Sequence, residues 1–375
     1  MVAAPPAAPR TVLVVGAGLV GAVTAWRLHR AGHRVVLIDP ALAPGQATAS
    51  TTGLRSGSAA ALGVLMGQVF HRSSGRGWRL RQQSLALWEE WLTELADRGH
   101  PVPHRRGLLL LSASPVEQER HVRLAMVRQA QGLPLELWDR ERLHSLEPAV
   151  PAGALSGLHS PADGQLDPAA ALEAFRIDSA AGGVTTVAER ASALERRGSG
   201  WRLALEGGGR FEAEWVVLAT AEGCGTLPGP VAEAWPLEPV LGQALELELG
   251  ADPSWSWPGA VLWRGINLVP RPDLARNGRR LWLGATVEPG RAASHQELAE
   301  LRNLGGEAPA WLLDAAVVRQ WRGLRYRPLG RPAPLLEEPE PGLLLATGHY
   351  RNGVLLAPAT AAWVCDRING AGRQV

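Results

Sequence analysis

The sequence contains no lysine, and this absence is the first constraint on its chemistry. All 38 of its Lys and Arg residues are arginine, which excludes any mechanism that needs a lysine Schiff base. Only two cysteines occur, Cys224 and Cys365, and they are far apart and lack the spacing of metal ligands. This excludes a disulfide framework and a cysteine zinc site, and it predicts a reducing, cytoplasmic location. The histidines are scattered as well, so we expect no metal site.

Long charged runs and membrane-spanning runs are also missing. The 38 basic residues against 36 acidic ones give a net charge of only +2, so neither nucleic acid nor an anionic membrane surface is expected as a partner. Residues 11–26 carry no charge, but this run is shorter than a membrane span and contains three glycines. The opening MVAAPPAAPR lacks a basic region ahead of an apolar one, which predicts a short disordered leader rather than a signal peptide.

The most informative segment is TVLVVGAGLVGAVTAWRLHRAGHRVVLID at residues 11–39, which predicts a strand, a glycine turn, a helix and a second strand. In such a unit Gly16 allows the tight turn, Gly18 lets the backbone approach a pyrophosphate, and Gly21 lets the helix pack on the strand. Asp39 lies where a carboxylate would accept hydrogen bonds from the hydroxyls of an adenosine ribose. The segment predicts a site for FAD or NAD; the alternative is a structural glycine-rich turn.

The C-terminal segment indicates which of the two cofactors, FAD or NAD, the chain binds. The segment GLLLATGHYRNGVLLAPATAAWVCDRI predicts a buried strand that runs through a glycine-flanked loop into a terminal helix. That helix could direct its positive end at a flavin ring and stabilise negative charge on it. A nicotinamide enzyme usually has no reason to return its last strand and helix to the cofactor, so FAD is favoured. A nicotinamide-dependent dehydrogenase stays an alternative, and it would be colourless.

Between these ends the pattern changes along the chain. Helices are expected at residues 78–98, at 117–131, from an Asp167-Pro168 start to a glycine stop, and from a Ser294 cap to residue 304. Short strands dominate residues 184–218 and 244–287. We therefore predict an α/β fold with a Rossmann-like parallel sheet for FAD and an α+β substrate domain on a mainly antiparallel sheet. The predicted FAD-binding domain comprises residues 1–83, 147–233 and 324–375, and the substrate domain 84–146 and 234–323.

Four motifs occur together in one order: the N-terminal unit, VVLAT near the middle, WRGLR, and GHYRNGVLLAPAT. With them the chain resembles the D-amino-acid oxidase superfamily of flavoproteins, in particular the glycine oxidases of thiamine biosynthesis. The resemblance covers nearly the whole chain and implies an FAD-dependent oxidoreductase that oxidises the amine of a small, glycine-like amino acid to an imine. Oxygen or another acceptor would reoxidise the flavin. A homo-oligomer is compatible with the sequence.

The resemblance also implies site residues. Arg325 matches the family arginine that holds the substrate carboxylate bidentately, Arg351 lies near the same site, and Asn267 stands where an aromatic hydroxyl is usual. Trp263 is a candidate wall of the substrate pocket. The implied cofactor contacts are Gly16, Gly18, Leu19, Val20, Gly21, Asp39, Pro40, Ser58, Ala59, Ala60, Ala61, Ala191, His349, Tyr350, Arg351, Asn352, Gly353, Val354 and Leu355.

Several departures from the family pattern leave the substrate open. Asn267 replaces the aromatic residue, YRPLGRPAPLL follows the arginine motif, and Glu222 lies in AEGCG where small residues are usual. Neither cysteine matches the attachment site of the sarcosine oxidases, so FAD should be bound non-covalently. A D-amino-acid dehydrogenase, a sarcosine-type oxidase and a non-catalytic flavin-binding protein are the remaining alternatives.

Overall fold

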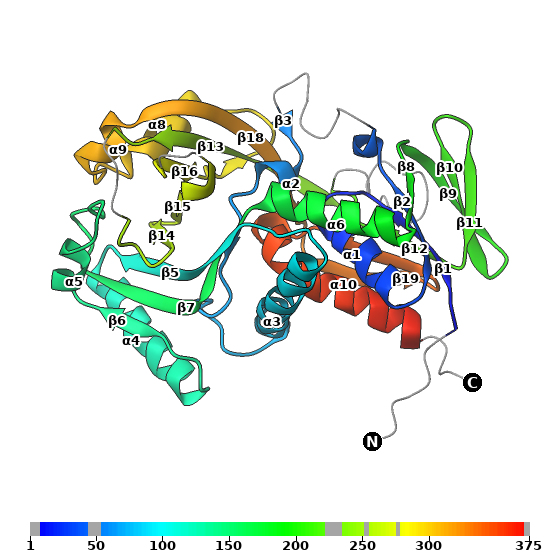
Figure 1. The fold of residues 1–375 in the computed structure, drawn as a ribbon, viewed down its shortest axis with the longest axis horizontal. Helices are drawn as coiled ribbons and strands as arrows, with labels where there is room; N and C mark the ends of the chain where they lie inside the picture. The colour runs from blue at the N-terminus through cyan, green and yellow to red at the C-terminus, as the bar shows by residue number, and fades with distance from the viewer. Residues whose placement is uncertain (1–7, 44–53, 222–234, 251–254, 275–277, 371–375) are drawn as a thin grey trace.

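The computed structural model describes residues 8–43, 54–221, 235–250, 255–274 and 278–370. Two large sheets lie next to each other, a mostly parallel one with helices packed beside it and a larger mixed one (Figure 1). Glu222 and Cys224 lie outside the described residues. No helix of the described residues is long and apolar enough to cross a membrane.

The parallel sheet carries the predicted nucleotide-binding unit. Its strand order is β19-β20-β12-β1-β2-β8, and every neighbouring pair is parallel except β19 with β20. The strands are β1 (Thr11–Val15), β2 (Arg34–Ile38), β8 (Thr185–Val187), β12 (Trp215–Leu218), β19 (Leu335–Glu340) and β20 (Leu343–Thr347). Strands from the start, middle and end of the chain therefore meet in one sheet.

Alternation along β1 explains why both faces of this sheet are covered. Val12 and Val14 point into a core with the helices, whereas Leu13 and Val15 point into a core with a three-stranded antiparallel sheet. The helices of the first core are α1 (Leu19–Arg30), α3 (Arg76–Asp97), α6 (Pro168–Gly182) and α10 (Gly353–Gly370). The three-stranded sheet consists of β9 (Ala191–Arg197), β10 (Gly200–Leu205) and β11 (Arg210–Ala213).

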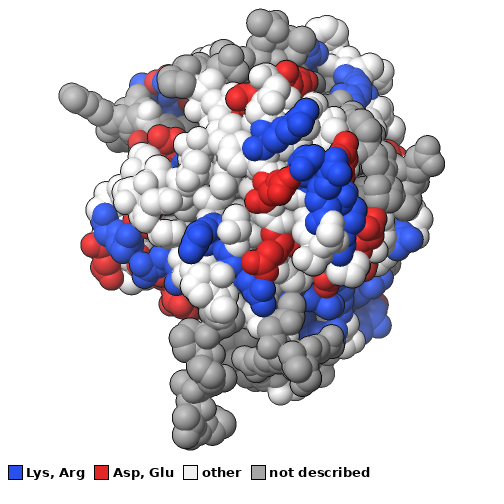
Figure 2. Space-filling view, turned by 90° about the vertical axis from the view of Figure 1, so that its right-hand side faces the viewer, with Lys and Arg blue, Asp and Glu red and all other residues white. Residues whose placement is uncertain are grey.

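On the side of the molecule that carries this small sheet, acidic and basic side chains are interspersed (Figure 2). The small sheet itself carries ion pairs of opposite charge, such as Arg202 with Glu212 and Arg197 with Glu195. A face of mixed sign offers no continuous positive surface to a polyanion.

The larger sheet has the path β3-β18-β13-β16-β15-β14-β5-β7-β4, with β17 and β6 pairing beside it. Most of its pairs are antiparallel, as predicted for the second domain. The strands are β3 (Leu54–Arg55), β4 (Val64–Leu65), β5 (His104–Ser112), β6 (Glu136–Trp138), β7 (Ser156–Leu166), β13 (Leu237–Glu248), β14 (Ala260–Trp263), β15 (Ile266–Pro270), β16 (Arg280–Gly284), β17 (Glu288–Pro289) and β18 (Ala316–Pro328).

The two faces of this sheet have different neighbours. Leu245 of β13 lies in a core with the outer helices α8 (His295–Asn303) and α9 (Ala310–Asp314), whereas the adjacent Ala244 faces Leu62, which follows α2 (Gly57–Ala60). The remaining elements are α4 (Pro115–Ala130), α5 (Arg140–His144) and the 3-10 turns η1 (Pro40–Leu42), η3 (Pro272–Leu274) and η4 (Tyr350–Asn352). The segment around α2 thus lies between the large sheet and the nucleotide unit.

We keep the two-domain division as a proposal, but several elements lie outside the domain that was predicted for them. Trp88, Trp91 and Leu95 of α3 lie in the core of the parallel sheet, although the predicted boundary at residue 83 divides this helix. Strands β3, β4 and β7 belong to the large sheet, although residues 1–83 and 147–233 were expected in the cofactor domain. Both differences arise from long-range packing, which local periodicity does not report.

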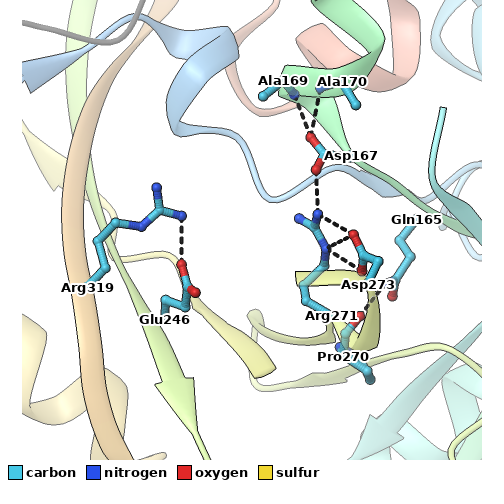
Figure 3. Close-up of polar contacts among 9 residues, drawn as sticks. All are labelled: Gln165, Asp167, Ala169, Ala170, Glu246, Pro270, Arg271, Asp273 and Arg319. Carbon is cyan, nitrogen blue, oxygen red and sulfur yellow. Dashed lines mark hydrogen bonds and ion pairs between the residues drawn. The ribbon is translucent and has the colours of Figure 1, made fainter. Parts of the chain in front are cut away.

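A charge network around the buried Arg271 joins the large sheet to α6 (Figure 3). Asp167 accepts hydrogen bonds from the N–H groups of Ala169 and Ala170 and so caps α6, while its other oxygen pairs with Arg271 at the end of β15. Arg271 also pairs with Asp273 and is only 2% exposed. The cap that was predicted from Asp167-Pro168 therefore also holds the helix N-terminus against the second sheet.

Candidate functional site

The glycine turn after β1 has the geometry that a nucleotide-binding unit needs. Gly16 has φ +102° and donates its N–H to the carbonyl of Ile38 at 2.8 Å. A Cβ on Gly21 would lie 1.8 Å from the carbonyl oxygen of Gly16, so only glycine lets α1 start this close to β1. Gly18 is the N-cap of α1 and supplies no side-chain cap, and the first turn carries no acidic residue. The positive end of α1 is thus available to an anion.

Asp39 closes this turn from the end of β2. Its carboxylate accepts hydrogen bonds from the N–H groups of Ala17 and Ala41, both at 2.7 Å, and caps η1, which begins at Pro40. Each oxygen keeps lone pairs beyond these single bonds. The carboxylate is therefore fixed beside the helix end and can still accept from a ribose.

The α2 segment packs against the same helix end. Ser58 Oγ accepts a hydrogen bond from the N–H of Leu19 at 2.9 Å, and a Cβ on Gly18 would lie 3.2 Å from this Oγ. The carbonyl of Ala60 accepts from Trp321 of β18 at 3.0 Å. Of the other predicted contacts here, Leu19 is buried, and Val20, Ala59, Ala60 and Ala61 are partly buried. The segment at residues 58–61 therefore lies between the nucleotide unit and the large sheet.

The C-terminal motif returns to this region from β20. His349 is buried, and its Nε2 lies 2.8 Å from Thr360 Oγ1. Burial, together with the charge of Arg76, lowers the pKa of His349 to about 3, so the imidazole is neutral at physiological pH. Tyr350 has φ +54° at the start of η4. Asn352 ends η4, Gly353 begins α10, and Val354 and Leu355 are buried in its first turn.

Arg325 and Arg351 form the cationic part of the site. Arg325 lies on β18 opposite Val240 of β13, is partly buried, and donates from Nη1 to the carbonyl of Thr286 at 2.9 Å. Burial and then the charge of Arg351 lower the pKa of Arg325 to about 10. No carboxylate of the described residues lies within ion-pair distance of this guanidinium. Its charge is therefore offset only from a distance, by groups such as Glu288.

Glycine on the neighbouring strand makes room for this guanidinium. A Cβ on Gly242 of β13 would lie 2.3 Å from Nη2 of Arg325. Glu288 is occupied by other donors, since it accepts hydrogen bonds from Gln243 and from the N–H of Ser294. Sequence reasoning missed Gly242 and Thr286, because only the strand register brings them to Arg325.

A groove of about 340 Å³ adjoins Arg351 and Thr286, the residue to whose carbonyl Arg325 donates. Its lining includes Gly265, Thr286, Val287, Glu300 and Arg351. Arg351 reaches across from η4 and donates to the carbonyl of Gly265 at 3.3 Å. The C-terminal motif and the large sheet thus share one wall of a pocket.

Three predicted residues have other surroundings. Asn267 lies on β15 and donates from Nδ2 to the carbonyl of Gly284 at 2.9 Å. Ala191 begins β9, partly buried beside the core of the small sheet. Trp263 is fully buried in the core under α8 and donates to the carbonyl of Leu304, so the prediction that it forms a wall of the pocket is wrong.

In the part of the chain that the structure describes, no three His, Cys, Asp or Glu side chains cluster to hold a metal ion.

Comparison with known proteins identifies the family. The model of the DAO family, described as FAD dependent oxidoreductase, matches residues 11–367. Glycine oxidase of Geobacillus kaustophilus (strain HTA426) is 29% identical over 365 residues, which are 95% of this chain and 92% of that protein. Glycine oxidase of Bacillus licheniformis is 26% identical over 365 residues, 96% of this chain and 92% of that protein.

Solved structures agree in fold. The crystal structure of glycine oxidase from Geobacillus kaustophilus matches with a TM-score of 0.81 at 25% identity, covering 96% of this chain and 95% of that one. Iminodiacetate oxidase from Chelativorans sp. BNC1 matches with a TM-score of 0.79 at 20% identity, covering 96% and 95%, which supports the fold alone. The predicted α/β fold class is confirmed.

The residues present fit FAD. The start of α1, which has no N-cap side chain of its own, the close approach allowed by Gly18 and the spare lone pairs of Asp39 suit a dinucleotide. The cofactor is bound non-covalently, and Cys365 is buried in α10. The chain belongs to the DAO family of FAD-dependent oxidoreductases.

Proposed function

We propose that this protein oxidises the amine of a small, glycine-like amino acid to an imine, with loss of a hydride from Cα. Bound FAD supplies the two-electron acceptor for this reaction. The chain's own residues hold the substrate: Arg325 binds its carboxylate, and Arg351 adds positive charge on the side of the groove.

One observation carries the proposal. Arg325 is a partly buried cation next to a second cation, and no described carboxylate lies within ion-pair distance of it. Such an arrangement is unfavourable without an anion, because both desolvation and like charge oppose the charged form. A substrate carboxylate would relieve both effects. The Arg325–Thr286 hydrogen bond fixes the planar fork, which leaves further N–H groups for a bidentate contact.

The groove and the relatives favour a small substrate. Gly265 and Val287 line the groove beside Arg351, so a short substituent on the substrate has room there. The relatives named above are glycine oxidases, which makes glycine the leading candidate and oxygen the proposed electron acceptor. A place in thiamine biosynthesis belongs to the same proposal, because the chain resembles glycine oxidases of that pathway. The cytoplasmic location stays a prediction.

The test starts with the purified protein. It is expected to be yellow, and its visible flavin band should bleach on anaerobic mixing with glycine, sarcosine, D-alanine or D-proline. The substrate with the fastest bleaching names the substrate class, and an oxygen electrode then separates an oxidase from a dehydrogenase. A D-amino-acid dehydrogenase would bleach faster with D-alanine than with glycine and would consume little oxygen. A yellow protein that none of the four amino acids bleaches would contradict the proposal.

A further inference from the structure

A proline interrupts the helix that follows the C-terminal motif. Pro358 lies in the sixth position of α10. Proline has no N–H, and its ring displaces the carbonyl four residues earlier, so the helix cannot satisfy the carbonyl of Val354 by itself. Val354 and Leu355 are buried, where water cannot replace the missing donor. The first turn of α10 therefore needs partners from outside the helix.

Helix α3 supplies these partners. Trp88 donates from Nε1 to the carbonyls of Val354 at 3.1 Å and of Leu355 at 3.2 Å. Ser84 Oγ accepts a hydrogen bond from the N–H of Ala359 at 3.2 Å, directly after the proline. Ser84 is fully buried and Trp88 is 1% exposed. Two side chains of α3 thus bond backbone groups of α10 on both sides of Pro358.

A third residue of α3 extends this contact to η4. Arg81 donates from Nη2 to Asn352 Oδ1 at 3.0 Å and from Nη1 to the carbonyl of Gly77 at 3.0 Å. Its guanidinium lies over the ring of Phe70, 3.8 Å from the centroid. Because Arg81, Ser84 and Trp88 are spaced i, i+3 and i+7, they share one face of α3.

We propose that Arg81, Ser84 and Trp88 are positioning residues for FAD, acting through η4 and the first turn of α10. This inference rests on the proposed cofactor contacts of residues 349–355. A helix N-terminus stabilises negative charge only within its first turn. Bound FAD gains negative charge when it is reduced, so the orientation of the first turn of α10 decides how strongly this helix stabilises the reduced cofactor. The side chains of α3 bond the turn of α10 that precedes Pro358.

The central variant is Trp88→Phe, which keeps an aromatic ring and removes the indole N–H. Its matched control is Trp26→Phe, because Trp26 is also 1% exposed, lies in the same core and donates from Nε1 to Asp178 at 2.8 Å. Both variants lose one buried indole N–H donor, but only that of Trp88 contacts the turn. The measurements are the dissociation constant of FAD from the apoprotein and the midpoint potential of the bound FAD, both without substrate.

We expect Trp88→Phe to weaken binding of oxidised FAD about tenfold and of reduced FAD about 100-fold, which lowers the midpoint potential by about 30 mV for a two-electron couple. Trp26→Phe should lower thermal stability to a similar extent and leave both cofactor measurements at the wild-type values. Ser84→Ala should shift the same two measurements in the same direction as Trp88→Phe, which keeps the test available if Trp88→Phe does not fold.

A rescue variant tests the mechanism. Adding Pro358→Ala to Trp88→Phe returns a backbone N–H that can bond the carbonyl of Val354, so the potential and the FAD affinity should recover. No recovery, or equal effects of Trp88→Phe and Trp26→Phe, would overturn the positioning role. Since no substrate is used, these outcomes are independent of the amino acid proposed above. A wild-type protein that binds no FAD would instead contradict the cofactor assignment.

Discussion

Replacing Arg325 with alanine should weaken the use of carboxylate substrates while FAD stays bound. One N–H of Arg325 already bonds the carbonyl of Thr286, so we expect two further N–H groups to bond the substrate. Hydrogen bonds to charged groups contribute roughly 1.5 to 3 kcal/mol each. Because Arg351 keeps part of the positive charge nearby, we expect a loss of roughly 3 to 4 kcal/mol, about 10²- to 10³-fold in kcat/KM.

The assay compares kcat/KM, from anaerobic bleaching of the flavin band, in the wild type and three variants. Arg325→Lys keeps a charge but not the planar fork, so its loss should be smaller than that of Arg325→Ala but clear. Arg202→Ala removes an arginine from a surface ion pair in the small sheet and should behave as wild type. Wild-type kcat/KM in a yellow Arg325→Ala protein would refute the role of Arg325.

The pKa of Arg325 gives a second test of the same role. Burial and the charge of Arg351 lower this pKa to about 10, so the free enzyme loses this positive charge as pH rises through about 10. Glycolate has a carboxylate but no amine, so its own charge is constant in this range. Its dissociation constant should rise about tenfold per pH unit above pH 10. A constant value from pH 8 to 11 would show that another group holds the carboxylate.

Three further predictions concern stability and cofactor retention. Burial holds the pKa of His349 at about 3, below the value of 6.5 in an unfolded chain, so the unfolded state binds more protons between these values. The free energy of unfolding should therefore fall by about 2 kcal/mol between pH 7 and pH 5 through this group, and urea titrations should show a smaller fall in His349→Gln. The Cβ of Gly21→Ala would collide with the carbonyl of Gly16, so this variant should lose its fold or its colour. Gly18→Ala meets only the side-chain oxygen of Ser58, so it should keep a near-wild-type melting temperature but release FAD more readily, as the absorbance of the filtrate would show.

Local patterns were sufficient to predict the elements that local chemistry determines. Ser294 does cap α8, accepting a hydrogen bond from the N–H of Glu297, and Asp167 does cap α6. Gly183 ends α6 with φ +108°, a conformation that glycine adopts without strain. In each case the capping or terminating residue lies within a few residues of the helix end that it specifies, so a short stretch of sequence is enough to predict that helix end.

The register of the large sheet could not be predicted in this way. Val240 faces Arg325 only because β13 and β18 pair with one particular offset, and a shift by one residue would move Arg325 to the other face. That offset depends on which side chains fill the two cores of the sheet, and these come from segments far apart in sequence. Gly242, which makes room for the guanidinium, therefore carried no local signal that set it apart from other glycines.

The contact between α3 and α10 shows why helix periodicity correctly predicted α3 but not its role. Trp88 contributes to the apolar stripe of α3, so the pattern accounts for it as core. Its indole N–H has a different task, because Pro358 removes a donor from α10 and leaves a buried carbonyl that needs one. A buried carbonyl without a hydrogen-bond donor is destabilising. The indole of Trp88 supplies the donor that Pro358 lacks, although neither residue is unusual in its own segment. The proposed positioning role of Trp88 therefore depends on a contact between distant segments, which the sequence pattern of neither segment contains.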